Sequence, residues 1–358
     1  MKGRRNVLAN LPWPAVALLV LSSCGPVTSA PVDSPGPSDT QAVTKPCKLP
    51  VGIGRGTSGF VAYPAGSFTP DPSSDLSSSP YRGPNATSVG GLGAPSYDWS
   101  ARRWLPVKPA LISPDGVSYA YSELIYPPVG PTPINGPGPG PIGSKVHVVT
   151  VSSAADRVVL DSRSLWEAVA YSGRKIFLIK QCLGGCGPGS GGLWTLDPST
   201  GALDQLIAPE GQPPANSSTG LSQRIWAVIG ADAAWATDPQ GALARFDFAT
   251  KSVSVWFTVP GKMLRPIGLD ARGFPIAEGE ADYRVTGSSR GGAWRVIAPQ
   301  QAVQIVPDST MIDGALTDSH GTWLLSFERI YLLLGGLDLR QIAVLSGRGD
   351  RALAGPCQ

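Results

Sequence analysis

The stretch LWEAVAYSGRKIFLIKQ at residues 165–181, followed by GGLWTLDPSTGALDQLIAP at residues 191–209, decides the fold. Each half consists of two short apolar runs separated by a turn that contains Gly or Asp, which is the pattern of a β-hairpin. Two such hairpins in succession predict one four-stranded antiparallel sheet.

The same unit returns along most of the chain. Successive copies are roughly 40 to 60 residues apart, a spacing typical of propeller repeats. The first hairpins of the copies are at 50–64, 108–123, 165–181, 225–240, 264–279 and 311–328. The second hairpins are at 96–107, 144–160, 191–209, 241–260, 291–307 and 330–345. Six copies predict an all-β fold, a six-bladed β-propeller, and seven blades are the alternative if residues 64–96 contain further strands.

The strands have the composition expected of sheets packed between neighbouring sheets. The first strands mix small and branched residues, as in VGIG at 51–54 and AVA at 168–170, which suits the crowded axis of a propeller. Later strands such as IFLI at 176–179 are apolar on both faces, because each blade lies between two others. A β-sandwich would show cleaner alternation, and an α/β fold would show helical periodicity between its strands.

Residues 1–23 have the features of an export signal. Three basic residues fall within the first five, and the apolar stretch at 15–21 is too short to span a bilayer. It ends in LSSC at 21–24, which resembles the lipobox of bacterial lipoproteins. The resemblance implies that signal peptidase leaves Cys24 as the first residue and that Cys24 carries lipid, palmitate included. An ordinary secretory signal with an incidental Cys is the alternative.

After this signal peptide the chain divides into two parts. Residues 24–46, which comprise the lipidated Cys and a Pro- and Ser-rich stretch without periodicity, predict a disordered tether. Residues 47–358 predict the propeller domain. We therefore expect a membrane-anchored lipoprotein on the extracytoplasmic side of the cell envelope.

The charge balance narrows the class of partner. The chain has 29 basic and 26 acidic residues, and removing the leader with its three basic residues leaves 26 of each (29 − 3 = 26). A nearly neutral domain has no basic field for nucleic acid or anionic lipid. We expect the membrane to be reached through the lipid anchor alone, an envelope protein or small molecule as partner, no nucleic acid, and a monomer.

Four cysteines remain once Cys24 is set apart, and an exported protein can oxidise them. Cys47 begins the folded region and Cys357 is the penultimate residue, so a bridge between them would join the two ends of the domain. Cys182 and Cys186 lie close together in one loop and would close a small ring. A redox-active pair at 182 and 186 and a metal site are the rival interpretations, although two His in the chain supply few metal ligands.

Three stretches resemble known propeller repeats. SPDGVSYAYSE at 113–123 resembles the TolB-type repeat, and GADAAWATD at 230–238 and GGLWTLDPSTG at 191–201 are similar to repeats of virginiamycin B lyase-like propellers. These resemblances imply the fold, and fold alone does not assign a function. In the lyase-like enzymes the chemistry uses His and Glu on the active face, and His320 does not map onto that role because its turn is expected on the opposite face.

Long inserts point to one end of the propeller as the binding face. Second-to-third strand loops and blade-to-blade connections share a face, and insertions that collect on one face of a repeat protein commonly mark its binding surface. The inserts are 65–95, 124–143, 182–190, 209–220 and 280–290. Acidic residues near this face form the candidate site, and they are Glu123, Asp238, Glu278, Glu280, Asp282 and Glu328. Solvated strand ends are the alternative interpretation of these acids.

The sequence contains no catalytic constellation, and we expect no cofactor and no metal. His147 in a third strand and His320 in a short turn have no nucleophile or second His at a useful spacing, so both are interpreted as structural or surface residues. The leading hypothesis is a binding or scaffold module that uses the insert-bearing face. The second is a propeller lyase or hydrolase that uses the carboxylates of the same face.

Overall fold

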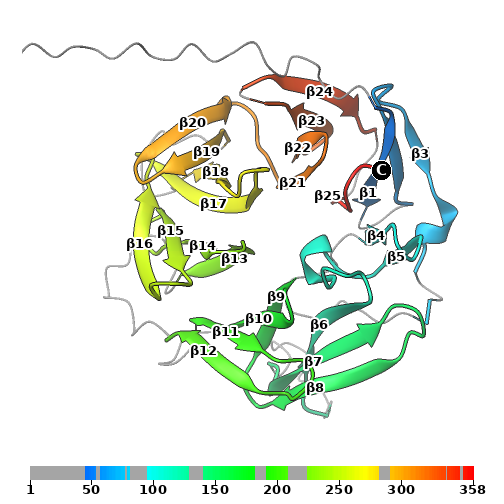
Figure 1. Ribbon diagram of the computed structural model, residues 1–358, viewed down its shortest axis with the longest axis vertical. Helices are drawn as coiled ribbons and strands as arrows, with labels where there is room; N and C mark the ends of the chain where they lie inside the picture. The colour runs from blue at the N-terminus through cyan, green and yellow to red at the C-terminus, as the bar shows by residue number, and fades with distance from the viewer. Residues whose placement is uncertain are drawn as a thin grey trace, which may run out of the picture. The chain divides into compact units, whose positions relative to one another are not determined.

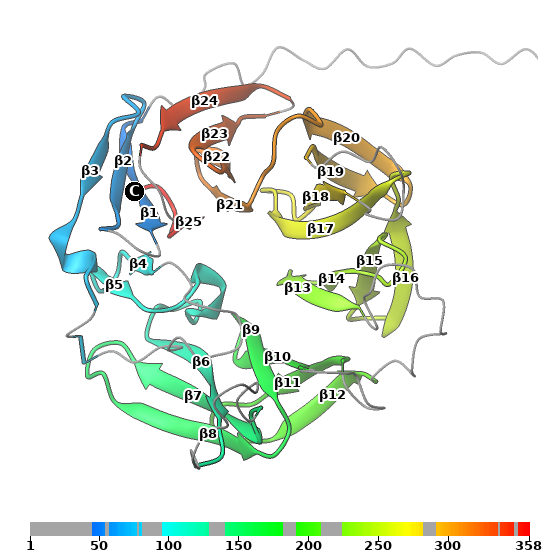
Figure 2. The ribbon, with the colours of Figure 1, turned by 180° about the vertical axis from the view of Figure 1, so that it is seen from behind.

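The computed structural model describes residues 45–53, 57–76, 79–80, 95–128, 140–181, 191–208, 224–281, 291–335, 337–346 and 350–358. Residues 41–358 form one compact unit. In this unit the described strands make seven antiparallel sheets, five with four strands, one with three and one with two, arranged around a common axis as in a β-propeller (Figure 1, and from behind Figure 2).

Four sheets consist of four consecutive strands each, and they confirm the predicted hairpin pairs. The first is β9 (Trp166–Ser172), β10 (Lys175–Lys180), β11 (Leu193–Leu196) and β12 (Leu203–Ile207). The second is β13 (Ile225–Ile229), β14 (Ala233–Thr237), β15 (Leu243–Asp247) and β16 (Ser252–Phe257). The third is β17 (Lys262–Leu269), β18 (Pro275–Ala281), β19 (Ala293–Ala298) and β20 (Gln301–Val306). The fourth is β21 (Gly314–Asp318), β22 (Gly321–Ser326), β23 (Arg329–Leu333) and β24 (Leu339–Val344).

The fifth four-stranded sheet joins the two ends of the domain. Its order is β25 (Arg351–Leu353), β1 (Cys47–Ile53), β2 (Gly59–Tyr63) and β3 (Phe68–Pro70). The C-terminal strand β25 lies nearest the axis (Figure 1). The sequence analysis placed residues 51–54 at the axis, and the structure corrects this, because β25 pairs with the inner edge of β1 and makes β1 the second strand.

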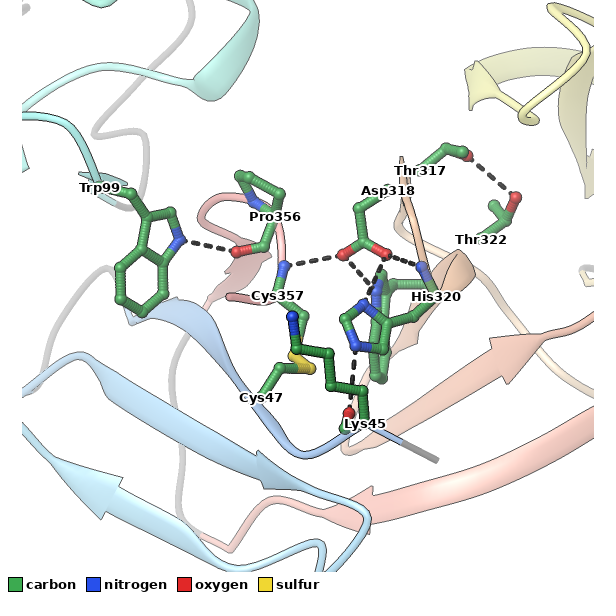
Figure 3. Close-up of polar contacts among 10 residues, drawn as sticks. Lys45, Cys47, Trp99, Thr317, Asp318, His320, Thr322, Pro356 and Cys357 are labelled. Carbon is green, nitrogen blue, oxygen red and sulfur yellow. Dashed lines mark hydrogen bonds and ion pairs between the residues drawn. A yellow bond between two sulfur atoms is a disulfide. The ribbon is translucent and has the colours of Figure 1, made fainter. Parts of the chain in front are cut away.

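A disulfide and a buried carboxylate hold this closure (Figure 3). Cys47 and Cys357 are bonded, as predicted, with their Cα atoms 5.5 Å apart. Asp318 Oδ2 accepts hydrogen bonds from the Cys357 amide and the Trp323 indole, each at 2.7 Å, and Asp318 Oδ1 accepts one from the His320 amide at 2.7 Å. The last turn of the chain is therefore fixed to the sheet that precedes it around the axis.

The sector between β1–β3 and β9–β12 is less regular. It contains the 3-10 helices η1 (Pro72–Ser74) and η2 (Pro109–Leu111), the two-stranded sheet β4 (Ser96–Asp98) with β5 (Arg103–Leu105), and the three-stranded sheet β6 (Ser118–Ile125), β7 (Gly143–Thr150) and β8 (Asp156–Ser162). The predicted union of 50–64 with 96–107 in one blade is wrong. Strands β25 and β3 already occupy the edges of that sheet, so among the described strands β4 and β5 pair only with each other.

Apolar clusters fill the space between neighbouring sheets. One cluster spans β6–β8 and β9–β11, and others join each of the following sheets to the next, ending with Trp323 and Leu325 against Leu49 and Val61. Both faces of the middle strands are buried, as predicted for blades packed side by side. No helix in the described part of the chain is long and apolar enough to cross a membrane.

Candidate functional site

A cavity of about 440 Å³ lies among the innermost strands. Residues of β13, β17, β21 and β25 line it together with η2, and we call it the axial cavity. Most of its wall is apolar, with Lys108, Arg265, Asp313 and Arg351 as the charged exceptions. Asp313 precedes β21 and Arg351 begins β25. These two groups therefore lie toward the end of the propeller at which the connections between sheets enter the inner strands. This is also the end that carries the inserts.

Arg265 holds two of the predicted acids beside this cavity. Its guanidinium makes an ion pair with Glu278 through Nη2, and its Nε lies 3.2 Å from Glu278 Oε2 and 3.2 Å from Glu280 Oε1. The pair follows from register, because Arg265 on β17 is directly opposite Glu278 on β18. Arg265 is part-exposed and Glu278 has no exposed surface.

The surroundings of Glu278 raise the pKa of its carboxyl group. Burial raises the pKa of Glu278 above its ordinary value, Arg265 opposes that rise, and the negative charges of Asp313 and Glu280 add to it. Glu278 Oε1 has no hydrogen-bond partner among the described residues. Two carboxylates, Glu278 and Glu280, therefore share one arginine beside the axial cavity.

Glu123 belongs to a different site, between β6, β7 and β8. Its Oε2 lies 3.2 Å from His147 Nε2, and His147 Nδ1 lies 2.9 Å from Asp156 Oδ1. The Tyr121 ring stacks on the His147 imidazole at 4.5 Å, and the Tyr121 hydroxyl donates to Asp156 Oδ2 at 2.8 Å. Burial, then the hydrogen bond to Asp156, raises the pKa of Tyr121. His147 is buried in a polar network across three strands, which agrees with the structural role expected of it.

Asp238 and Glu328 do not join either cluster. Asp238 is buried and caps its own turn, because its Oδ1 accepts the Gln240 and Ala242 amides at 2.8 Å. Glu328 lies exposed in the turn between β22 and β23. Asp282 lies outside the described residues, as do Cys24, Cys182 and Cys186 and most residues of the long inserts.

His320 is explained by the closure of the domain. Its Nε2 lies 3.2 Å from the Lys45 carbonyl oxygen and its Nδ1 lies 3.4 Å from Asp318 Oδ1 (Figure 3). It is thus a structural residue next to the disulfide. Within the described residues no group of three or more His, Cys, Asp or Glu side chains could hold a metal ion.

Four residues of these two clusters were not predicted from the sequence, namely Arg265, Asp313, Tyr121 and Asp156. Tyr121 could have been found from register, since it lies directly opposite His147. The shift between Pro266 and Gly268 hides the pairing of Arg265 with Glu278. Asp313 comes close to Glu278 only through the packing of strands around the axis, for which the sequence carries no local signal. Asp156 lies diagonally across from His147, since its direct partner in the β7–β8 hairpin is Val149.

Comparisons with known proteins do not assign a family. No protein-family model matches the sequence, and no curated protein does. TolB from Acinetobacter baumannii is 12% identical with a TM-score of 0.42, over 86% of this chain and 64% of that one. A Bacteroides fragilis protein described as a 6-phosphogluconolactonase is 10% identical with a TM-score of 0.39, over 66% and 69%. An extracellular domain from B. thetaiotaomicron, described as part of a hybrid two-component system, is 12% identical with a TM-score of 0.37, over 85% and 35%. This chain therefore spans less than two thirds of the TolB chain, and likenesses of this strength carry no argument about activity.

Proposed function

We propose that this protein is a lipid-anchored, extracytoplasmic binding module that takes its ligand into the axial cavity, with the long inserts as the rim of the entrance. The observation that carries the proposal is the cavity itself, a space of about 440 Å³ with apolar walls and a few charged groups at one end. Small-molecule sites commonly have this composition and size. The ligand that fits is a small molecule or chain segment with an apolar body and a polar end directed at Arg265 and Asp313.

Two features support the extracytoplasmic address. The Cys47–Cys357 disulfide is of a kind that persists in oxidising compartments, and the lipobox-like sequence ending at Cys24 supplies an anchor. The test of the anchor is Cys24→Ser with membrane fractionation and labelling by a palmitate analogue. We expect the label to be lost and the variant to leave the membrane fraction, and a variant that stays labelled would overturn the anchor.

We infer that the domain has seven blade positions, with β4–β5 as a reduced blade. Seven blades are the alternative that the sequence left open. A residue with positive φ recurs in the outer hairpin of six sheets, β4–β5 included. These residues are Gly66, Arg102, Ala154, Gly201, Lys251 and Gln300. The shared turn supports β4–β5 as the outer hairpin of a repeat of its own, because αL is uncommon for non-glycine residues and its recurrence at one position marks equivalent turns.

An enzyme of the lyase or hydrolase class is the second candidate. One observation favours it, because Glu278 and Glu280 are neighbouring carboxylates of which one has a raised pKa, a pattern used for acid–base chemistry. Against it, Glu278 has no exposed surface and its Oε2 is held by Arg265. A general acid must reach the proton's destination, so binding is the better supported function.

The test of the binding function blocks the axial cavity from an exposed position. Ala227 is exposed and lines the cavity, so Ala227→Trp fills it without disturbing the core. Ala249→Trp, in an exposed turn far along the sheet, is the matched control. Native mass spectrometry and crosslinking of protein purified from its own envelope should find a bound molecule or partner with the control and not with Ala227→Trp. Equal recovery with both variants would refute the proposal.

A further inference from the structure

We propose that a second cavity, beside the reduced sheet β4–β5, binds an organic ammonium group. The cavity has a volume of about 370 Å³ and is lined by residues 97–100 of β4 and its turn, by residues 109 and 112–116, and by residues 354–356 and 358 after β25. Among its lining residues only Pro109 also lines the axial cavity. The segments that follow β25 and precede β6 lie where first strands end, so this cavity is at the end opposite the inserts.

The cavity lies beside the smallest of the described sheets. The described residues of this sector form two short strands, whereas the sheets on either side have three or four. The C-terminal tail closes one side of the space, and the Trp99 indole donates a hydrogen bond to the Pro356 carbonyl oxygen at 2.7 Å (Figure 3). The wall therefore depends on a contact between the tail and the β4–β5 turn.

Two aromatic rings form part of the wall. Tyr97 and Trp99 both line the cavity, with ring centroids 4.8 Å apart in an edge-to-face arrangement. Phe60 packs against both rings, at 4.9 Å and 5.7 Å, so they are held in place from behind. Aromatic faces attract cations through the ring quadrupole.

The charged groups of the wall are acidic. Asp98 and Asp115 line the cavity, and none of the described residues that line it is Lys, Arg or His. Asp98 is 7% exposed, and its Oδ1 accepts the Ser100 amide at 2.8 Å and the Ser100 hydroxyl at 2.7 Å. Its Oδ2 has no hydrogen-bond partner among the described residues. A buried carboxylate oxygen without a donor is costly and calls for a cation.

The local electrostatics agree with a cation site. Hydrogen bonds from the Ser113 hydroxyl and the Val117 amide hold the pKa of Asp115 below its ordinary value, so Asp115 is ionised at neutral pH. Burial raises the pKa of Tyr97, with the charges of Asp71 and Asp98 adding to the rise and Arg102 opposing it. Arg102 lies outside the lining and does not fill the space.

The chemistry selects an ammonium ion over a metal. Two carboxylates and two aromatic rings match a quaternary or primary ammonium group with a short apolar body, whereas no three potential metal ligands come together in the described residues. A volume of about 370 Å³ accommodates a choline-sized molecule or a lysine side chain. Both ligands contain an ammonium group, and the probes below distinguish its quaternary form from its primary form.

The test is an NMR titration that follows the Trp99 indole resonance, which Trp99→Phe identifies. The probes are choline with its uncharged isostere 3,3-dimethyl-1-butanol, and n-butylammonium with 1-butanol. At least one ammonium should shift the resonance with an affinity at least tenfold above that of its alcohol. The ammonium that binds more tightly, choline or n-butylammonium, shows whether the cavity prefers the quaternary or the primary form. Equal effects of ammonium and alcohol, or no shift with either ammonium, would overturn the proposal.

The decisive variant is Asp98→Asn, which removes the charge and keeps Oδ1 to accept the bonds from Ser100. Asp197 makes the same bonds to Ser199, at 2.8 Å and 2.6 Å, in the β11–β12 turn, so Asp197→Asn is the matched control. Asp98→Asn should weaken ammonium binding at least tenfold and Asp197→Asn should leave it unchanged. Asp115→Asn, in an exposed turn, repeats the test if Asp98→Asn does not fold. Unchanged affinity in the folded variants would refute the cation site, and an unaffected Ala227→Trp keeps this result separate from the axial cavity.

Discussion

The disulfide between Cys47 and Cys357 should supply a large part of the domain's thermal stability. The two residues are 310 positions apart in the sequence, so the bridge restricts nearly the whole unfolded chain. In the chain-entropy model a loop of this length corresponds to about 5–6 kcal/mol at 25 °C. With an unfolding entropy of about 2.1 cal/mol/K per residue, a domain of this size loses about 8–9 °C in Tm for that change.

The assay is thermal unfolding of the Cys47→Ser/Cys357→Ser double variant by calorimetry or circular dichroism. We expect a Tm about 8–9 °C below that of the oxidised protein, since the contacts of the folded state are otherwise kept. Reductant should lower the Tm of the natural protein toward that of the variant and should hardly affect the variant. A Tm within about 2 °C of the oxidised protein would show that the bridge does not restrict the unfolded chain in this way.

Substitutions at three further positions test the domain closure at Asp318, the turn at Gly66 and the buried acid Glu278. Asp318→Ala leaves three buried donors without their acceptor and should cost about 3–5 kcal/mol in urea unfolding, against a smaller loss for Asp318→Asn. Gly66→Ala should lower the Tm strongly, since φ is +72° and a Cβ would overlap the Ile342 carbonyl oxygen, whereas Gly173→Ala at φ +59° meets no atom within 4 Å and should cost about 1 kcal/mol. Burial raises the pKa of Glu278 above 4.5, so the folded state binds its proton more tightly than the unfolded state. This group's contribution is therefore most favourable below pH 4.5 and falls as pH rises through the raised pKa. The Tm of the natural protein minus that of Glu278→Gln should thus decrease from pH 4 to pH 8. A difference that stays constant would contradict a raised pKa of Glu278.

The repeated hairpins were predictable because their signals are local. In β9–β12 the strands, their turns and their order follow from apolar runs and turn residues that are adjacent in the sequence. The disulfide was predictable for a related reason, since a propeller must bring its first and last sheets together and the two cysteines lie at the ends of the domain.

Strand β25 was not predictable in the same way. Three residues, Arg351–Leu353, form a strand only because the inner edge of β1 is available after the other sheets have closed around the axis. Their own sequence has no alternation that distinguishes them from a tail. The same dependence on distant partners explains β4–β5, which cannot be assigned until both edges of the β1–β3 sheet are known to be occupied.

The candidate site shows where register limits inference from sequence. Glu278 was singled out as an acid near a strand end, and its partner Arg265 lies directly across from it. The β17–β18 register, however, shifts between Pro266 and Gly268, so counting back from the turn pairs the wrong residues. A one-residue shift moves every side chain to the other face, which is why the arginine escaped notice.

The closure and the second cavity depend on the same tail, and this links two of the proposals. The tail leaves β25 at Leu353, lines the cavity with Ala354 and Pro356, and is then fixed by Cys357. Without the disulfide the tail keeps the Trp99–Pro356 hydrogen bond, the Asp318 bond to the Cys357 amide and its backbone hydrogen bonds to Lys48, Pro50 and Tyr97. Each of these is a net contribution of only about 1 kcal/mol. At temperatures below its Tm, the Cys47→Ser/Cys357→Ser variant should therefore bind ammonium several-fold more weakly than the oxidised protein. The amount of ligand recovered from the axial cavity should be the same for both. An ammonium affinity equal to that of the oxidised protein would show that the tail holds the cavity wall without the bridge.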